Sequence, residues 1–348
     1  MNNLFFIFCL FLIFLNALIC VYSIPIARFF KIIDYPKNNK KKIHTKPTPL
    51  VGGLIFFTNI ILFIFFDIFM GSNSVTGSQF LFDLRFISLK QIITFFIVII
   101  SIYFVSFYDD VYDISPFKKS LLFLIILYLL IISNPNVQIS NLNFYIFDKN
   151  LEFNDFSMFL TLFCILSFMN AANMFDGINL QSAILYFSFL LIFLIKGIDQ
   201  RFLIIFLVCL IFFIYMNSKG KMFIGNNGSY FLSFLVSIII ICDHNWNKNY
   251  FVEEIFLYMF FPGVDMIRLC LTRIKNNQSP LKGDNNHIHH LLLKKFNYSK
   301  SISIIFLLIL TPIILFNYFN INLLVLISLN FILYLLLLIV CLKNKSTN

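Results

Sequence analysis

Long uninterrupted apolar runs constrain this chain more than any other feature of its sequence. A helix that crosses the roughly 30 Å hydrocarbon core of a bilayer needs about 20 apolar residues in a row. About eleven runs of this kind occur, and they cover residues 4–24, 50–70, 90–107, 117–133, 157–174, 179–195, 201–216, 228–242, 252–271, 301–317 and 321–341. The sequence therefore predicts an all-α fold, a polytopic bundle of about 11 transmembrane helices.

The scarcity of charge supports the same fold class. The 348 residues are 60% hydrophobic and only 12% charged, which is too little charge to solvate a soluble protein of this size. The first run has no positively charged residue before it and no small-residue cleavage site after it, so we expect a retained helix and not a secretory signal. Since no linker or internal repeat divides the chain, residues 1–348 are expected to form a single integral membrane domain.

The distribution of Lys and Arg predicts the orientation of the helices. If the N-terminus lies outside, 20 of the 26 Lys and Arg residues fall on the inner side and six on the outer side. Positive residues favour the cytoplasmic loops of membrane proteins, so we expect an outside N-terminus and a cytoplasmic C-terminus. The net charge of +10 then reflects this topology and contact with the lipid bilayer, or an anionic substrate. No nucleic acid partner is expected, because no soluble segment is long enough to form a basic domain.

A group of carboxylates ends the third apolar run, on the predicted cytoplasmic side. Asp109, Asp110 and Asp113 fall within five residues, and their mutual repulsion near a membrane surface favours a bound cation. Mg²⁺ suits this role because it binds carboxylates, keeps several waters and completes its coordination with substrate phosphates. The alternative is a solvated acidic loop in which Asp113 caps the next helix.

Two further polar clusters border apolar runs on the same predicted side. Asn170 and Asn173 are three residues apart and share a helix face that points, with Asp176, toward the same mouth. Buried amides in a bundle often only join neighbouring helices, which is the alternative for this cluster. Gly225 and Asn226 precede the eighth run, where glycines let backbone N–H groups approach a phosphate or a ribose. A plain turn explains this second cluster equally well.

Histidines are concentrated on the same side. His44, His287, His289 and His290 are four of the five in the chain, and Arg273 precedes the last three. The H-I-H-H spacing does not suit zinc, because no Cys or Glu accompanies it and adjacent histidines rarely share one ion. Donation to a diphosphate is the better interpretation, although any one of them can instead be a structural histidine.

Together with the K-P-T-P run at Lys46 and Thr48, these segments resemble the polyprenyl-phosphate N-acetylhexosamine-1-phosphate transferase family, of glycosyltransferase family 4 type. The match extends from about Lys31 to Leu293, in order and with similar spacing. The H-I-H-H motif followed by leucines resembles the branch that uses UDP-N-acetylhexosamines (UDP-HexNAc) more than the pentapeptide transferases. K-P-T-P taken alone also fits simple capping of a helix entrance.

The resemblance implies a phosphotransferase of EC 2.7.8 type in the bacterial inner membrane, multi-pass, with its site facing the cytoplasm. Such an enzyme transfers HexNAc-1-phosphate, for example GlcNAc-1-phosphate, from a UDP-sugar to undecaprenyl phosphate. It releases UMP and starts the synthesis of a cell-surface polysaccharide such as lipopolysaccharide O-antigen. The oligomeric state stays open, with a homodimer as one option.

The resemblance also implies a role for each polar cluster. The catalytic residues are Asp109, Asp110 and Asp113, with Asp109 removing a proton from the lipid phosphate. The metal ion is Mg²⁺, with Mn²⁺ as an alternative, and its ligands are Asp109, Asp110, Asp176 and Asn226. The substrate-binding residues are Lys46, Thr48, Asn170, Asn173, Asp176, Arg273, His287, His289 and His290.

Three positions depart from the family pattern, and other functions compete with this one. Asn226 stands where the family usually has Asp, which allows weaker Mg²⁺ binding or a catalytically weakened homologue. Leu180 stands where Gly commonly follows the D-G-I-N run, and Asn285 stands where Arg commonly follows Asp284. An intramembrane prenyltransferase would need a second aspartate-rich run. A transporter or lipid flippase would need carboxylates at mid-depth and broken helices, whereas the clusters here lie at helix ends on one side.

Overall fold

The computed structural model describes residues 2–36, 46–71, 78–280 and 285–342, and the statements below concern this part of the chain. His44 and the tail 343–348, both assigned above to the cytoplasmic side, lie outside the described residues.

The described part is mostly helical. Nine helices are long and apolar enough to cross a membrane: α1 (Asn2–Val21), α3 (Gly52–Met70), α5 (Leu89–Tyr112), α6 (Pro116–Ser133), α7 (Ser157–Phe175), α9 (Gln200–Ser218), α10 (Gly225–Asn247), α14 (Tyr298–Phe319) and α15 (Leu323–Leu342). The other helices are α2 (Ser23–Phe29), α4 (Gln79–Asp83), α8 (Gln181–Lys196), α11 (Val252–Tyr258), α12 (Phe260–Lys275), α13 (Ile288–Lys295) and the 3₁₀ turn η1 (Pro135–Val137). Two antiparallel pairs complete the fold, β1 (Ile33–Asp34) with β2 (Thr48–Pro49) and β3 (Asn141–Phe144) with β4 (Lys149–Glu152).

Each of the eleven predicted apolar runs coincides with helical structure, which confirms the prediction of a multi-pass helical membrane protein. The number of candidate spans is nine, or ten if α11 and α12 form one span, within the part that the structure describes. The difference has two causes. α8 is apolar but has only 16 residues, and the run at 252–271 is divided into α11 and α12, which meet at 79°. Backbone groups surrounded by lipid must be satisfied within the segment, which is why these runs form helices.

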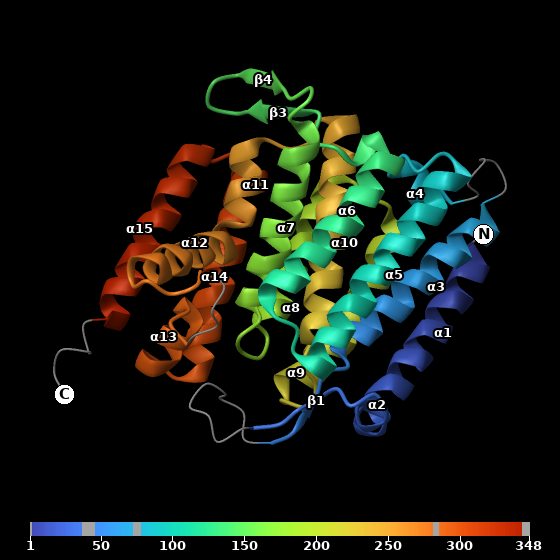
Figure 1. Ribbon diagram of the computed structural model, residues 1–348, viewed down its shortest axis with the longest axis horizontal. Helices are drawn as coiled ribbons and strands as arrows, with labels where there is room; N and C mark the ends of the chain where they lie inside the picture. Colours follow the sequence, from blue (N-terminus) through green and yellow to red (C-terminus); the bar gives the residue numbers. More distant parts are fainter. Residues whose placement is uncertain (1, 37–45, 72–77, 281–284, 343–348) are drawn as a thin grey trace.

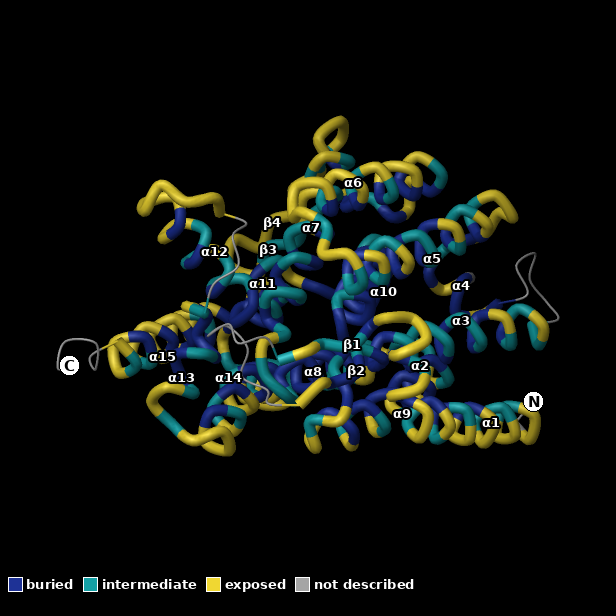
Figure 2. The backbone as a smooth tube through the Cα atoms, turned by 60° about the horizontal axis from the view of Figure 1, so that its bottom comes forward, coloured by how far each residue is buried: buried dark blue, intermediate teal, exposed yellow. Residues whose placement is uncertain are grey.

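Helix α10 forms the centre of the bundle. In its most apolar 18-residue window, 94% of the residues are buried, against 17–50% in the other candidate spans. Figure 2 shows the buried tube of α10 surrounded by helices whose outward faces are exposed. The outer helices expose apolar faces, which lipid would cover. Their inward faces pack against α10.

Glycines let α3 approach the start of α10. Gly52 and Gly53 donate backbone hydrogen bonds of 2.9 Å each to the carbonyls of Phe223 and Ile224. A Cβ at position 53 would lie 1.8 Å from Asn227 Oδ1 and within 2.5 Å of the Gly228 backbone. Small residues are what close contact between membrane helices requires. This contact fixes the first turn of α10 beside the first turn of α3.

The two ends of the bundle differ in character. At the end with β3 and β4 (Figure 1), Glu253 accepts the backbone N–H groups of Tyr145 and Ile146, at 2.9 and 3.2 Å, and so holds the turn between these strands. At the opposite end, β1 and β2 lie beside the ends of α5, α7 and α9 and the start of α10 (Figure 1). The polar clusters found in the sequence lie at this second end.

Replacing Gly53 by Ala is expected to lower the free energy of unfolding by about 1–3 kcal/mol, because the new methyl group overlaps Gly228. Gly263→Ala is the matched control, since a Cβ there meets no atom within 4 Å. Thermal unfolding of the two purified variants in detergent measures the difference. Equal stability of Gly53→Ala and the native chain would show that α3 and α10 are not in the contact described.

Candidate active site

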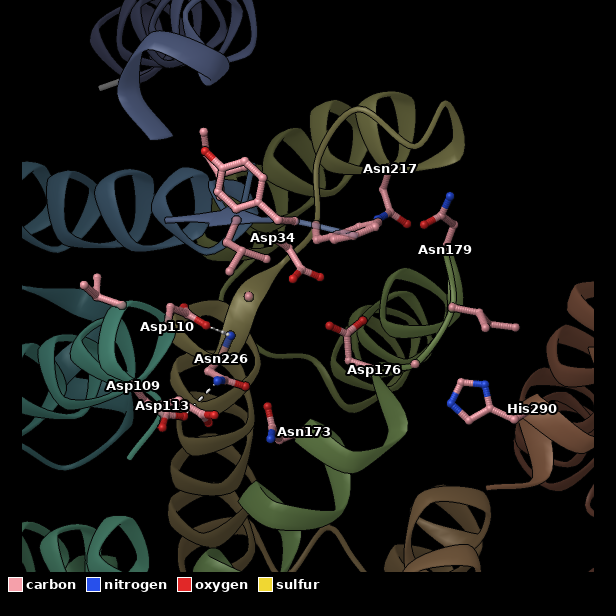
Figure 3. A pocket seen from close by; sticks show the side chains of 18 of the residues that line it. Asp34, Asp109, Asp110, Asp113, Asn173, Asp176, Asn179, Asn217, Asn226 and His290 are labelled. Atoms are coloured by element: carbon pink, nitrogen blue, oxygen red, sulfur yellow. Dashed lines mark hydrogen bonds between the residues drawn. The ribbon is translucent and has the colours of Figure 1, made fainter. Parts of the chain in front are cut away.

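A cavity of about 740 Å³ opens at the end of the bundle that carries β1. It is lined from β1, from the ends of α5, α7 and α9, and from α10, α13 and α14. Its carboxylate, amide and imidazole side chains are those of Asp34, Asp109, Asp110, Asp113, Asn173, Asp176, Asn179, Asn217, Asn226 and His290 (Figure 3). Segments that are more than 200 residues apart in sequence thus meet in one place.

Asp109 is buried in the last turn of α5 and accepts three hydrogen bonds. Its Oδ1 accepts the backbone N–H of Ile114 at 2.8 Å, which closes the turn into α6. Its Oδ2 accepts from Lys119 Nζ and from Asn226 Nδ2, both at 2.7 Å. The Lys119 ammonium also lies 4.8 Å from the centre of the Tyr230 ring. Asp109 therefore has a cationic partner within the chain, and both groups are shielded from solvent.

Asp110 joins the end of α5 to the start of α10. Its two oxygens accept the backbone N–H groups of Asn226 and Asn227 at 2.9 Å each, and Oδ2 also accepts Asn227 Nδ2 at 2.7 Å. The first N–H groups of a helix have no partner within it, and the helix dipole favours a negative charge there. Gly225 makes the approach possible, because it has φ +74° and a Cβ would lie 3.0 Å from Asp110 Oδ2.

The amides of α7 are held by the first turns of α10. Asn173 Oδ1 accepts from Ser229 Oγ at 2.6 Å, and Asn173 Nδ2 donates to the Tyr230 hydroxyl at 3.2 Å. The same hydroxyl donates to Asn170 Oδ1 at 3.3 Å. Asn173 lines the cavity, whereas Asn170 lies one turn below it in contact with Tyr230. The two predicted amides thus share one partner, Tyr230, which was not predicted from the sequence.

Asp176 follows α7 and projects into the cavity near the middle of the view in Figure 3. None of the ion pairs among the described residues includes it. Burial raises the pKa of the Asp176 carboxyl to about 6, since its surroundings stabilise the charged form poorly. A cation beside this carboxylate would favour its charged form.

The three histidines of H-I-H-H have three different environments. His287 Nδ1 lies 2.9 Å from Asp265 Oδ2, and the same carboxylate pairs with Arg268 at 2.8 Å. His289 is buried, with its Nδ1 3.1 Å from Gln181 Nε2. Burial, together with the neighbouring histidines, lowers the pKa of His289 well below its usual range, so the ring is neutral. His290 alone of the three lines the cavity.

Gly177 explains how His289 can pack against the turn after α7. A Cβ on Gly177 would lie 1.9 Å from His289 Nε2. In the D-G dipeptide, the aspartate therefore lines the cavity and the glycine leaves space for the buried imidazole. His289 supports the Asp176 turn from behind, and the structure does not place it in the cavity lining.

Several other predicted residues lie outside the cavity lining. Thr48 is buried in β2, paired with Asp34 of β1, and its hydroxyl donates to the Lys46 carbonyl at 3.1 Å. Lys46 is exposed beside this strand. Arg273 is buried at the end of α12, where it donates to the Pro280 carbonyl at 2.7 Å. Asp113, unlike these three residues, does line the cavity; it is exposed and has φ 54°.

Three residues that organise this end of the bundle were not predicted from the sequence: Lys119, Tyr230 and Asp265. Lys119 was visible in the sequence only as one of two adjacent lysines, and nothing in the spacing distinguished it from Lys118. Asp265 carried a usable signal, because a carboxylate within an apolar run needs a partner. It accepts from His287, Arg268, Tyr334 and the Ile288 backbone.

The contacts allow a test of whether these residues fit a magnesium ion. Asp176 fits, because it is an oxygen donor of the kind that Mg²⁺ prefers and has no cationic partner among the described residues. Asp109 and Asp110 fit less well, because both Oδ2 atoms already accept two N–H groups each and both Oδ1 atoms accept one. Among the described residues, no three His, Cys, Asp or Glu side chains gather into a metal site. The ligand set given above therefore stays a prediction and is not a pre-formed centre.

Sequence comparisons identify similar proteins. Residues 92–243 match the family model described as Glycosyl transferase family 4. The "Undecaprenyl-phosphate alpha-N-acetylglucosaminyl 1-phosphate transferase" of Escherichia coli (strain K12) is 26% identical over 80% of this chain and 74% of its own length. The protein of the same name from Salmonella typhi is 25% identical over 76% of this chain and 69% of its own length. The "Probable undecaprenyl-phosphate N-acetylglucosaminyl 1-phosphate transferase" of Bacillus subtilis (strain 168) is 24% identical over 78% and 72%.

The family match contains the carboxylates of α5, the amides of α7 and the start of α10, which form the centre of the cavity. The relatives extend the similarity over most of the chain. Residues 92–243 thus match glycosyl transferase family 4, which confirms the resemblance found in the sequence. The chain is a distant homologue of the undecaprenyl-phosphate GlcNAc-1-phosphate transferases.

Proposed function

We propose that this chain transfers HexNAc-1-phosphate from UDP-HexNAc to undecaprenyl phosphate, with release of UMP. The observation that carries the proposal is the meeting of carboxylates, amides and an imidazole from distant segments in one cavity at a single end of the bundle. The substrates are proposed from the names of the relatives and from the resemblance.

The chemistry is a displacement at phosphorus. An oxygen of the lipid phosphate attacks the β-phosphorus of the UDP-sugar, the bond from that phosphorus to the bridging oxygen breaks, and UMP leaves with the bridging oxygen. Both reactants are anions, so catalysis consists largely of positioning and charge neutralisation. Asp109 accepts any proton that remains on the lipid phosphate, and this demand is modest because the second ionisation of a phosphate lies near neutral pH.

Lys119 and His290 are the residues proposed to meet the negative charge of the substrates. Lys119 is held beside the carboxylate pair by Asp109, with Nζ to Oδ2 at 2.7 Å. His290 lies on the far side of the cavity from Asp109 in the view of Figure 3. Lys119 itself does not line the cavity, so its charge would act on a bound diphosphate through Asp109, whereas His290 lies in the lining. Asp176, between these groups, is the position at which a bound Mg²⁺ would supply further neutralisation.

The cavity is proposed to face the cytoplasm of a bacterium, at the inner membrane. The excess of Lys and Arg on the predicted inner side supports this orientation, because the cavity end of the bundle carries Lys118, Lys119, Lys219 and Lys221. UDP-sugars are water-soluble and a polyprenyl phosphate is confined to the bilayer. A cavity at a helix end is the position where the two can meet.

Purified protein mixed with undecaprenyl phosphate, Mg²⁺ and a panel of UDP-HexNAc donors is expected to release UMP with at least one donor. Asp109→Asn is expected to lower kcat by about 10²-fold or more, since it removes both the proton acceptor and the partner of Lys119. Asp155→Asn changes an exposed carboxylate far from the cavity and serves as the control. Absence of UMP with every donor would remove the proposed function.

Lys119→Met is expected to lower kcat by about 10²-fold, because it removes the preorganised positive partner of Asp109 at the edge of the cavity. Lys118→Met is the matched control: Lys118 is the neighbouring residue, is exposed, and has no part in the network around Asp109. Steady-state UMP release, together with the Tm of both variants, separates loss of catalysis from loss of folding. Equal activity in the two variants would exclude the role given to Lys119.

The orientation is tested with single cysteines in a chain whose seven native cysteines are replaced by alanine. Lys118→Cys and Ser299→Cys, both exposed near the cavity end, are expected to be protected from a membrane-impermeant thiol reagent in intact cells. Asn150→Cys, exposed in β4, is expected to react. Reaction at only one of the two cavity-end positions would separate the segments that the proposed site requires on one side of the membrane.

A further inference from the structure

The negative charge of Asp109 and Asp110 is partly offset by groups of the chain itself. Six N–H groups point at the four oxygens of this pair, and one of them belongs to the ammonium of Lys119. The two Oδ2 atoms accept two hydrogen bonds each, which uses both lone pairs of each atom. At these two Oδ2 atoms, the donors occupy the positions from which a metal ion would approach.

Asn226 is the residue that decides whether this arrangement is stable. Its side-chain nitrogen donates to Asp109 while its backbone nitrogen donates to Asp110, so one residue bridges both carboxylates (Figure 3). The Nδ2 to Oδ2 distance is 2.7 Å. A carboxylate at the same position would face Asp109 as a like charge, and three neighbouring carboxylates require a cation.

We propose that Asn226 and Lys119 close the Asp109–Asp110 pair to divalent ions while the nucleotide site is empty. The pair is then an internal ion pair that fixes α5, α6 and α10 together. It does not act as a pre-formed metal site, and a metal ion enters this pocket only with an anionic substrate that brings further ligands. The inference concerns the pocket of the proposed function but does not depend on the transfer reaction.

Thermal unfolding of the full-length chain in detergent tests this, with MgCl₂ titrated at constant ionic strength and without nucleotide. The native chain is expected to keep its Tm. Asn226→Asp is expected to unfold at a lower temperature without Mg²⁺ and to gain about 2 °C or more with it, because binding to the folded state stabilises that state. Asn179→Asp is the matched control, since it adds the same charge to the cavity lining away from the pair.

Two outcomes would overturn the inference. The first is a Mg²⁺-dependent rise in Tm of the native chain as large as that of Asn226→Asp. The second is a response of Asn226→Asp no larger than that of Asn179→Asp.

A second measurement uses only the native chain, in case Asn226→Asp does not fold. Mn²⁺ replaces Mg²⁺ at oxygen sites, and its electron paramagnetic resonance signal diminishes when it binds to protein. Equimolar native chain without nucleotide is expected to leave the signal of free Mn²⁺ unchanged, and loss of that signal would contradict the inference. Neither measurement uses turnover, so failure of the inference and failure of the proposed function are distinguishable.

Discussion

The capping of α10 by Asp110 is the interaction on which the geometry of the site depends. The unpaired N–H groups at the start of α10 need an acceptor, and at this end of the bundle the carboxylate of a neighbouring helix supplies it. That contact brings the last turn of α5 to the first turn of α10, and the glycine contact of α3 with α10 adds a third helix. Because α10 is buried along its length, it sets the position of every helix that packs around it.

The location of the cavity follows from the solvent properties of a bilayer. Within the hydrocarbon region, each backbone polar group must be satisfied by the helix itself, so irregular backbone and exposed carboxylates are confined to helix ends. The turns after α5 and α7 and before α10 are such ends. The charged substrates proposed for this chain require the same boundary, because one is dissolved in water and the other in lipid.

Apolarity predicted most of the fold but not its interruptions. All eleven runs are helical, yet nothing in their hydropathy distinguished the 16 residues of α8 from a full span. The 79° bend between α11 and α12 had a local signal in Pro262 and Gly263, which follow the break by a few residues. Proline is tolerated in a first helical turn and not in an interior, so this dipeptide marks the start of a new helix.

The sequence predicted which segments form the site better than it predicted the contacts between their side chains. The carboxylates of α5, Asn173, Asp176, Asn226 and His290 do meet in the cavity. The partners of His287 and His289 could not be inferred, because Asp265 and Gln181 come from other helices and spacing along the chain carries no information about them. At Leu180, by contrast, the sequence did carry a signal. This residue has φ 66°, a conformation that favours glycine, and glycine is common at this position in the family.

The contact between Gly177 and His289 has a consequence for the evolution of this chain. The space for a methyl group on residue 177 is already filled by an imidazole from a helix more than 100 positions away. A larger side chain at position 177 would become possible only after His289 was replaced by a smaller residue. The two sites are therefore bound to change together, and pairs of this kind are what make one segment of a sequence informative about another.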